Sequence, residues 1–195
     1  MALEGRAAAD DILIGDTPKA VRRRGRLKGL SARGRLWKHS GLADIDGVVT
    51  PAEMQDFFVF TLVRNPWDRL VSYYAWLQDQ RIDHPAARLA QRLDFSAFLR
   101  HPGIAETFRA HPYGASVSLA GRDLCNLYLR LERLSVDLPR LEAALGQKLA
   151  PLPWLNRSDR RGDYRTYYSD QEAAVVADFC AEDIARFGYC FDPEG

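Results

Sequence analysis

Apolar side chains dominate residues 57–63, FFVFTLV, a stretch of strand length that is interrupted only by Thr61. A segment that is apolar at nearly every position is typical of a strand covered on both faces in a parallel sheet. A second apolar segment, LCNLYLRL at residues 124–131, predicts a second strand, and a short strand is expected at residues 36–38. We therefore expect these segments to belong to a parallel sheet.

Helical periodicity follows the first of these strands. The residues Trp67, Leu70, Val71, Tyr74 and Leu77 share one face of a helix with about 3.6 residues per turn. Further helices are expected at residues 1–11, 42–48, 85–93, 95–100, 135–145 and 170–187, and a short one opens at the Thr50–Glu53 capping box. Ser135 is the expected cap and Gly146 the stop of one of these helices, and a capping box at Ser169 and a terminal Gly188 bound the last. Residues 101–123 are expected to be loop with a short helix. Strands that alternate with helices predict an α/β domain.

Length and composition favour one globular domain over residues 1–195. The chain has 195 residues, of which 47% are hydrophobic, enough for a sizeable core. Its 27 basic and 26 acidic residues nearly cancel, so the net charge gives no reason to expect nucleic acid or an acidic membrane as a partner.

Charge is nevertheless concentrated locally. Residues 19–38 hold nine Lys or Arg and three Gly, which predicts a basic, mobile connection. A nucleic-acid-binding module that uses this segment is an alternative function for the chain. Trp37 is the single aromatic residue of the segment, however, and the segment follows no recognisable nucleic-acid-binding pattern.

The cysteines and histidines predict neither a disulfide framework nor a metal site. The three cysteines are odd in number and lack metal-ligand spacing, which favours reduced thiols in a cytoplasmic protein. His84, His101 and His111 each precede a proline and are interpreted as turn residues. Neither a secretory signal nor an apolar run of about 18 residues is present, so no membrane span is expected.

Arg64 marks the most informative junction of the chain, the sequence VRNPWD. Asn65 is a favourable helix N-cap and Pro66 a favourable first helical residue, so the arginine is held where the predicted strand ends and a helix begins. Ser72 lies roughly two helical turns further on, within reach of a bulky anion bound by Arg64. The alternative, an ion pair of Arg64 with Asp68, fits the spacing equally well.

The segment FVFTLVRNPWDRLVSYY closely resembles the 3′-phosphate-binding segment of sulfotransferases that use 3′-phosphoadenosine 5′-phosphosulfate (PAPS). The resemblance implies that Arg64 and Ser72 bind the nucleotide 3′-phosphate. The stretches WKHS, LYLRLERL and YYSDQEAAVVADFCAEDIARFGY extend it over most of residues 30–190, towards bacterial relatives of the Golgi carbohydrate sulfotransferases.

The family resemblance also implies a fold and a reaction. The fold is a P-loop-type α/β domain with three layers and a parallel sheet. In the reaction, a sulfuryl group moves from the co-substrate PAPS to an acceptor hydroxyl, here expected on a carbohydrate or glycolipid. His39 is the candidate base and Lys38 the cation near the sulfate, although His39 is equally well explained as a helix-start residue. Tyr164, Arg160 and Arg161 are expected in a loop that covers the nucleotide.

One family element is not found in the sequence. The family begins with a strand and a phosphate loop of the type PKTGGTS, but the Thr-Pro-Lys at residues 17–19 has neither the glycines nor a preceding apolar strand. We therefore expect a sheet that lacks its first strand and phosphate loop, with residues 1–11 forming the remainder of the next helix. A truncated active enzyme and an inactive protein with this fold are the two interpretations. A nucleotide kinase would need the same loop.

Overall fold

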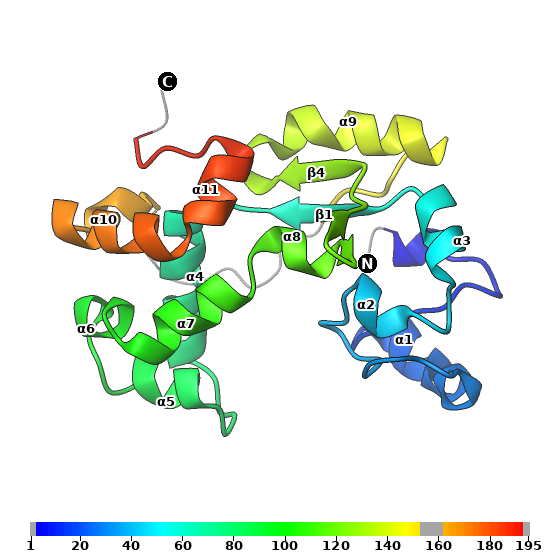
Figure 1. Cartoon of the computed structure of the whole chain (residues 1–195), viewed down its shortest axis with the longest axis horizontal. Helices are drawn as coiled ribbons and strands as arrows, with labels where there is room; N and C mark the ends of the chain where they lie inside the picture. The colour runs from blue at the N-terminus through cyan, green and yellow to red at the C-terminus, as the bar shows by residue number, and fades with distance from the viewer. Residues whose placement is uncertain (1–2, 153–161, 193–195) are drawn as a thin grey trace. The chain divides into compact units, whose positions relative to one another are not determined.

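The structure, a computed structural model, describes residues 3–152 and 162–192 (Figure 1). The chain forms two compact units. Among the described residues, the first unit contains 3–62 and 114–152, and the second contains 63–113 and 162–192. The fold is α/β, with a small parallel sheet and many helices, as the alternation of strands and helices predicted.

The parallel sheet belongs to the first unit and pairs β1 (Phe60–Val63) with β4 (Leu127–Arg130). The two arrows point the same way in Figure 1. Asn126 adjusts the register just before β4, because its backbone N–H donates to the Val59 carbonyl and its side-chain oxygen accepts from the Val59 N–H, both at 2.7 Å. Both strands are confirmed, each beginning three residues later than predicted.

A small apolar core forms where α9 (Leu134–Leu145) packs on β4. Leu127, Leu129 and Leu141 are buried there, with Phe60 of β1 packed against them. Gly146 ends α9 with φ of 64°, a left-handed conformation that glycine adopts without strain. The predicted stop is therefore confirmed, although α9 begins at Leu134, one residue before the expected cap.

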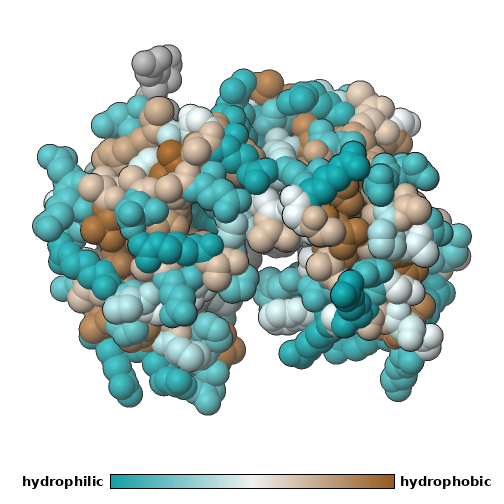
Figure 2. Space-filling view, in the orientation of Figure 1, coloured by the Kyte–Doolittle hydropathy of each residue, from teal (hydrophilic) through white to brown (hydrophobic). Residues whose placement is uncertain are grey.

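The expectation that the first strand is covered on both faces is wrong. Val63 is fully buried, but Phe57, Phe58 and Leu62 are 54%, 41% and 46% exposed. In the described part of the chain, β1 has one strand partner, β4, and residues 36–38 form a turn instead of the predicted strand. Hydrophobic residues accordingly reach the surface in small groups among hydrophilic ones (Figure 2).

The predicted N-terminal helix is also absent from the described residues. Only a single turn of 3₁₀-helix forms there, η1 (Glu4–Arg6). Lys19 Nζ donates to the carbonyls of Glu4 and Ala7 at 2.7 and 2.9 Å, and Arg23 donates to Ala8 at 2.6 Å. Because the Lys19 and Arg23 side chains donate to carbonyl groups that a helix would use, residues 7–16 form an irregular segment, the strap.

The same contacts order the basic segment, which was expected to be mobile. It contains α1 (Pro18–Arg23), capped by Thr17, and η2 (Arg24–Gly29). After it come α2 (Leu42–Ile45), three residues shorter than expected, and α3 (Pro51–Asp56), which begins at the predicted capping box of Thr50 and Glu53. Gly47 and Val48 form a turn after α2, between the bridged residues Asp46 and Val49.

Helices make up the second unit, around the apolar face of α4 (Pro66–Gln78). The five residues predicted to share this face are all buried. Packed around it are α5 (Pro85–Ala90), α6 (Phe95–Leu99), α7 (Pro102–Ala110), η4 (Tyr164–Tyr167), α10 (Asp170–Phe179) and α11 (Ala181–Phe187). His84 and His101 cap α5 and α7 through Nδ1, which accepts from the N–H groups of Ala86 and Gly103 at 3.2 Å.

Two regions are more finely divided than the sequence predicted. The helix expected at residues 170–187 breaks at Cys180, where φ is −105° and ψ is 16°, and α11 begins immediately afterwards. The region expected to be loop contains α7, α8 (Tyr113–Ser116) and a hairpin of β2 (Ser118–Leu119) with β3 (Arg122–Asp123).

Candidate functional site

Asn65 fixes the junction between β1 and α4. Its side chain is almost completely buried, with a residue exposure of 5%. Its Oδ1 accepts from the N–H groups of Trp67 and Asp68 at 3.0 and 3.4 Å, as an N-cap should. Its Nδ2 donates to the Tyr164 hydroxyl at 3.3 Å and to the Cys190 carbonyl at 3.2 Å. The start of α4 is thus tied to the C-terminal part of the second unit.

Two further hydrogen bonds hold the first turn of α4. Trp67 Nε1 donates to the Ala173 carbonyl at 2.9 Å, and the Tyr168 hydroxyl donates to the Trp67 carbonyl at 2.8 Å. Burial raises the pKa of Tyr168 far above its usual range, so this hydroxyl remains a donor. Arg64 therefore extends from a rigid support.

The Arg64 side chain forms an ion pair with Asp68. Its Nε and Nη2 both lie 2.6 Å from Asp68 Oδ2, and the two side chains are only 21% and 16% exposed. This is the alternative that the spacing left open. Because Asp68 is one turn into α4, the pair directs the guanidinium along the helix instead of out into solvent.

Ser72 lies on the same side of α4 as this pair. It is half-buried and stands four residues beyond Asp68, so the two residues are neighbours on one helix face. That face lies outside the set of core positions. An anion bound by Arg64 and Ser72 would have to share the guanidinium with the Asp68 carboxylate or displace it.

His39 and Lys38 lie in the first unit, whereas Arg64 and Ser72 lie in the second. His39 is exposed, and its ring meets Trp37 edge-on with a centroid distance of 4.7 Å. The interpretation of His39 as a helix-start residue finds no support, because α2 begins at Leu42 and Asp44 caps it by accepting from the Gly41 N–H at 2.8 Å.

Three neighbouring effects act on the His39 pKa. Partial burial and the Lys38 ammonium lower the pKa of His39, and the Asp16 carboxylate acts in the opposite direction. Lys38 itself forms an ion pair with Asp16 at 3.3 Å. A neutral imidazole beside a cation is suited to accepting a proton close to a developing negative charge.

Sequence reasoning missed Asp16 and gave Tyr164 a different role. Asp16 is 22 residues from Lys38 in the chain, and no motif connects them. Tyr164 was expected to cover a nucleotide, but its hydroxyl is used within the unit, since it also donates to the Phe191 carbonyl at 2.5 Å. Arg160 and Arg161, assigned to the same loop, lie outside the described residues.

Metal and membrane sites were searched over the same residues. Across residues 3–152 and 162–192, His, Cys, Asp and Glu side chains form no group of three or more that could hold a metal ion. None of the helices described has the length and apolar character needed to cross a membrane.

Comparison with known proteins identifies the family. Neither the curated proteins nor the solved structures that were searched contain a significant match to this chain. The model of one protein family, described as the sulfotransferase family, matches residues 38–191. The match contains Lys38, His39, Arg64 and Ser72, and its limits agree with the stretch over which the sequence resembles sulfotransferases. Since most of its length is matched, the chain belongs to the sulfotransferase family.

Proposed function

We propose that this protein transfers a sulfuryl group from PAPS to a hydroxyl group of a carbohydrate or glycolipid acceptor. Membership of the sulfotransferase family supports the type of reaction. The observation that carries the choice of donor is that Arg64, at the junction before α4, pairs with Asp68, one helical turn before Ser72 on the same side of α4. Hydrogen bonds of Asn65 hold this junction.

In this proposal Arg64 and Ser72 bind the 3′-phosphate of the nucleotide. Planar guanidinium groups suit phosphate oxygens because they donate two parallel hydrogen bonds, and the serine hydroxyl adds another donor. Asp68 keeps the Arg64 side chain in position before the nucleotide arrives. Its carboxylate also repels the incoming phosphate, so the 3′-phosphate binds at the cost of weakening this ion pair.

His39 and Lys38 carry the chemical step. An acceptor oxygen attacks sulfur and forms a new S–O bond, while the bond between sulfur and the bridging phosphate oxygen breaks. The electron pair of that bond leaves with 3′-phosphoadenosine 5′-phosphate, and the acceptor proton passes to His39. Lys38 stabilises the negative charge that develops on the bridging oxygen.

The remaining family features are part of the same proposal. Residues 1–195 then form a single sulfotransferase-like domain of the P-loop type, acting in the cytoplasm. The connections between the short elements of residues 79–123 shape the acceptor site, since loops on a fixed scaffold commonly determine specificity.

The proposal is tested by measuring nucleotide binding by calorimetry. The protein should bind 3′-phosphoadenosine 5′-phosphate at least about 10-fold more tightly than adenosine 5′-monophosphate, because a charge-assisted hydrogen bond contributes about 1.5–3 kcal/mol. Arg64→Ala should remove this preference, and Ser72→Ala should reduce it, while binding of the monophosphate stays nearly constant.

Two control variants separate the proposed roles. His39→Ala should leave nucleotide binding unchanged and should abolish most sulfuryl transfer to carbohydrate acceptors. Arg100→Ala removes another cation of the second unit, one that pairs with Glu172 at 3.5 Å, and should not affect nucleotide preference. Equal affinity for both nucleotides would contradict the assigned 3′-phosphate site. Selective binding without transfer to any acceptor would instead support an inactive member of the family.

A further inference from the structure

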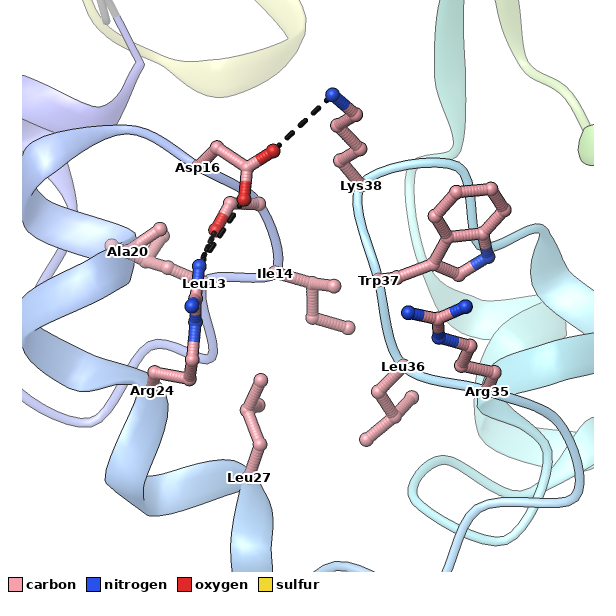
Figure 3. Close-up of a pocket in the computed structure, with 11 residues that line it drawn as sticks. Leu13, Ile14, Asp16, Ala20, Arg24, Leu27, Arg35, Leu36, Trp37 and Lys38 are labelled. Atoms are coloured by element: carbon pink, nitrogen blue, oxygen red, sulfur yellow. Dashed lines mark hydrogen bonds and ion pairs between the residues drawn. The ribbon is translucent and has the colours of Figure 1, made fainter. Parts of the chain in front are cut away.

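A pocket in the first unit shares one lining residue, Lys38, with the function proposed above. It is enclosed by residues 13–16 of the strap, by α1 and η2, and by residues 35–38, and its volume is about 330 Å³ (Figure 3). Apart from Lys38, its lining lies upstream of the residues that match the sulfotransferase family. The pocket is therefore a feature of this chain's own N-terminal segment.

The inner wall of the pocket is aliphatic. Leu13, Ile14, Leu27 and Leu36 line it and are each half-buried, and Ala20 beneath them is only 3% exposed. The side chains of Ile14, Leu27 and Leu36 point toward the same open centre in Figure 3. This wall can bury an apolar group, which gains roughly 0.8 kcal/mol for each methylene removed from water.

The rim of the pocket holds a carboxylate between two cations. Arg24 Nη2 lies 3.1 Å from one oxygen of Asp16, and Lys38 Nζ lies 3.3 Å from the other. Asp16 therefore shows where a flat anion with two oxygens can sit. The side chains of Arg24, Lys38 and Asp16 are 58%, 52% and 62% exposed. Such exposed ion pairs contribute little to stability.

Charge around the pocket favours an incoming anion. Arg35 adds a third cation to the lining and lies over the Trp37 ring, 5.1 Å from its centroid. Asp16 is the only carboxylate in the lining, against three cations, so the lining keeps an excess of positive charge even with Asp16 in place.

We propose that this pocket binds a small amphipathic monoanion, with a carboxylate or sulfate ester as its head and an alkyl or aryl group as its body. The head lies between Arg24 and Lys38, where the Asp16 carboxylate lies in the free protein, and the body covers Ile14, Leu27 and Leu36. Asp16 is then an internal competitor that turns toward solvent when the ligand binds. This site contains neither Arg64 nor Ser72, so it is separate from the proposed 3′-phosphate site, although Lys38 belongs to both proposals.

The probe for this proposal is octyl sulfate, used below its micellar concentration and followed by Trp37 fluorescence and calorimetry. It should bind at least 10-fold more tightly than ethyl sulfate, which offers the same head, and than octanol, which offers the same tail. Octanoate should also bind, because the position between Arg24 and Lys38 fits a carboxylate. Arg24→Ala should weaken binding of octyl sulfate by about 10-fold or more, since a charge-assisted contact is lost.

Asp16→Asn makes the sharpest test, because removing a competitor should strengthen binding of octyl sulfate several-fold, whereas damage to the pocket would weaken it. Leu27→Ser should reduce the preference for octyl over ethyl sulfate. Arg22→Ala, on the exposed side of α1 and outside the lining, is the matched control and should leave affinity unchanged.

Several results would overturn the proposal. Equal affinity for ethyl and octyl sulfate would contradict it, and so would weaker binding of octyl sulfate to Asp16→Asn. An equal loss of affinity in Arg22→Ala and Arg24→Ala would indicate unspecific adsorption to a basic surface. Far-ultraviolet circular dichroism of each variant verifies its fold. If Arg24→Ala fails to fold, the strengthening by Asp16→Asn decides alone. None of these measurements involves a nucleotide, so their outcome does not depend on whether the proposed transfer reaction takes place.

Discussion

His39 illustrates how single residues around a side chain set its chemistry. Its imidazole is exposed enough to reach an acceptor, yet partial burial and Lys38 both hold its pKa below the usual value, and Asp16 acts against them. A base must be neutral to accept a proton. The lowered pKa therefore favours the neutral imidazole at neutral pH, which is the form that the proposed base role requires.

Proton nuclear magnetic resonance of the His39 ring can test this balance. The wild-type pKa should lie below 6.5, the value for an unperturbed histidine. Lys38→Ala should raise the pKa because a repelling cation is removed, and Asp16→Asn should lower it because a stabilising anion is removed. The low-pH limb of kcat/KM for sulfuryl transfer should shift in the same directions.

Movement of the His39 pKa in the same direction in both variants would contradict the opposing roles of Lys38 and Asp16. An unchanged rate in His39→Ala, where a loss of about 10²–10⁴-fold is expected, would remove the residue from the reaction.

Residue-level contacts were predictable from sequence only when they were local. The pair of Arg64 with Asp68 follows from their spacing of four residues, and the spacing also offered it as an alternative to anion binding. The contacts of Lys38 with Asp16 and of Asn65 with Tyr164 join distant parts of the chain. Such contacts depend on how elements pack, which local patterns do not encode.

At the scale of elements, the junction before α4 is held by more hydrogen bonds than an ordinary helix start. Asn65→Ala should lower the free energy of unfolding by about 2–3 kcal/mol, because it removes both the N-cap and two donors to the buried interior. Asp94→Ala is the matched variant. Asp94 is exposed and caps α6 through one bond to the Ala97 N–H at 2.8 Å, so the loss should be about 1 kcal/mol.

Urea unfolding curves measure the difference in free energy of unfolding between Asn65→Ala and Asp94→Ala. Asn65→Asp separates the two contributions at Asn65, because it retains the capping oxygen and removes the Nδ2 donor. The free energy of unfolding of Asn65→Asp should lie between those of the wild type and Asn65→Ala. Equal losses in Asn65→Ala and Asp94→Ala would show that the bonds of Asn65 to Tyr164 and Cys190 add nothing.

Elements with their own start and stop signals were predicted well, as the capping boxes at Thr50 and Ser169 and the terminal Gly146 and Gly188 show. The helix expected at residues 1–11 failed for a different reason. Its composition favours a helix, but Lys19 and Arg23 bind its carbonyl groups. Propensity is a weak predictor where such side-chain contacts compete with helical hydrogen bonds.

At the scale of the whole molecule, charge distribution argues against the nucleic-acid-binding alternative. The basic residues 19–38 suggested a nucleic-acid-binding surface, but the chain has a formal net charge of only +1. Within the first unit, Arg23 and Arg26 donate to backbone carbonyls, and Arg24 and Arg33 pair with Asp16 and Asp46 at 3.1 and 3.2 Å. These cations therefore have partners within the protein, which reduce the field that they project into solvent.

The protein should therefore bind nucleic acid no better than unspecifically. Fluorescence anisotropy with a short labelled DNA duplex and with a single-stranded RNA should give dissociation constants no tighter than about 10⁻⁶ M at physiological salt, the tight end of the range for unspecific binding. Any binding at low salt should be lost as salt increases. Arg22→Ala combined with Lys28→Ala should change it little, because binding of this kind draws on the charge of the whole surface. Tight binding that survives physiological salt and disappears in this double variant would restore the basic segment as a recognition surface and place it among the functions of the chain.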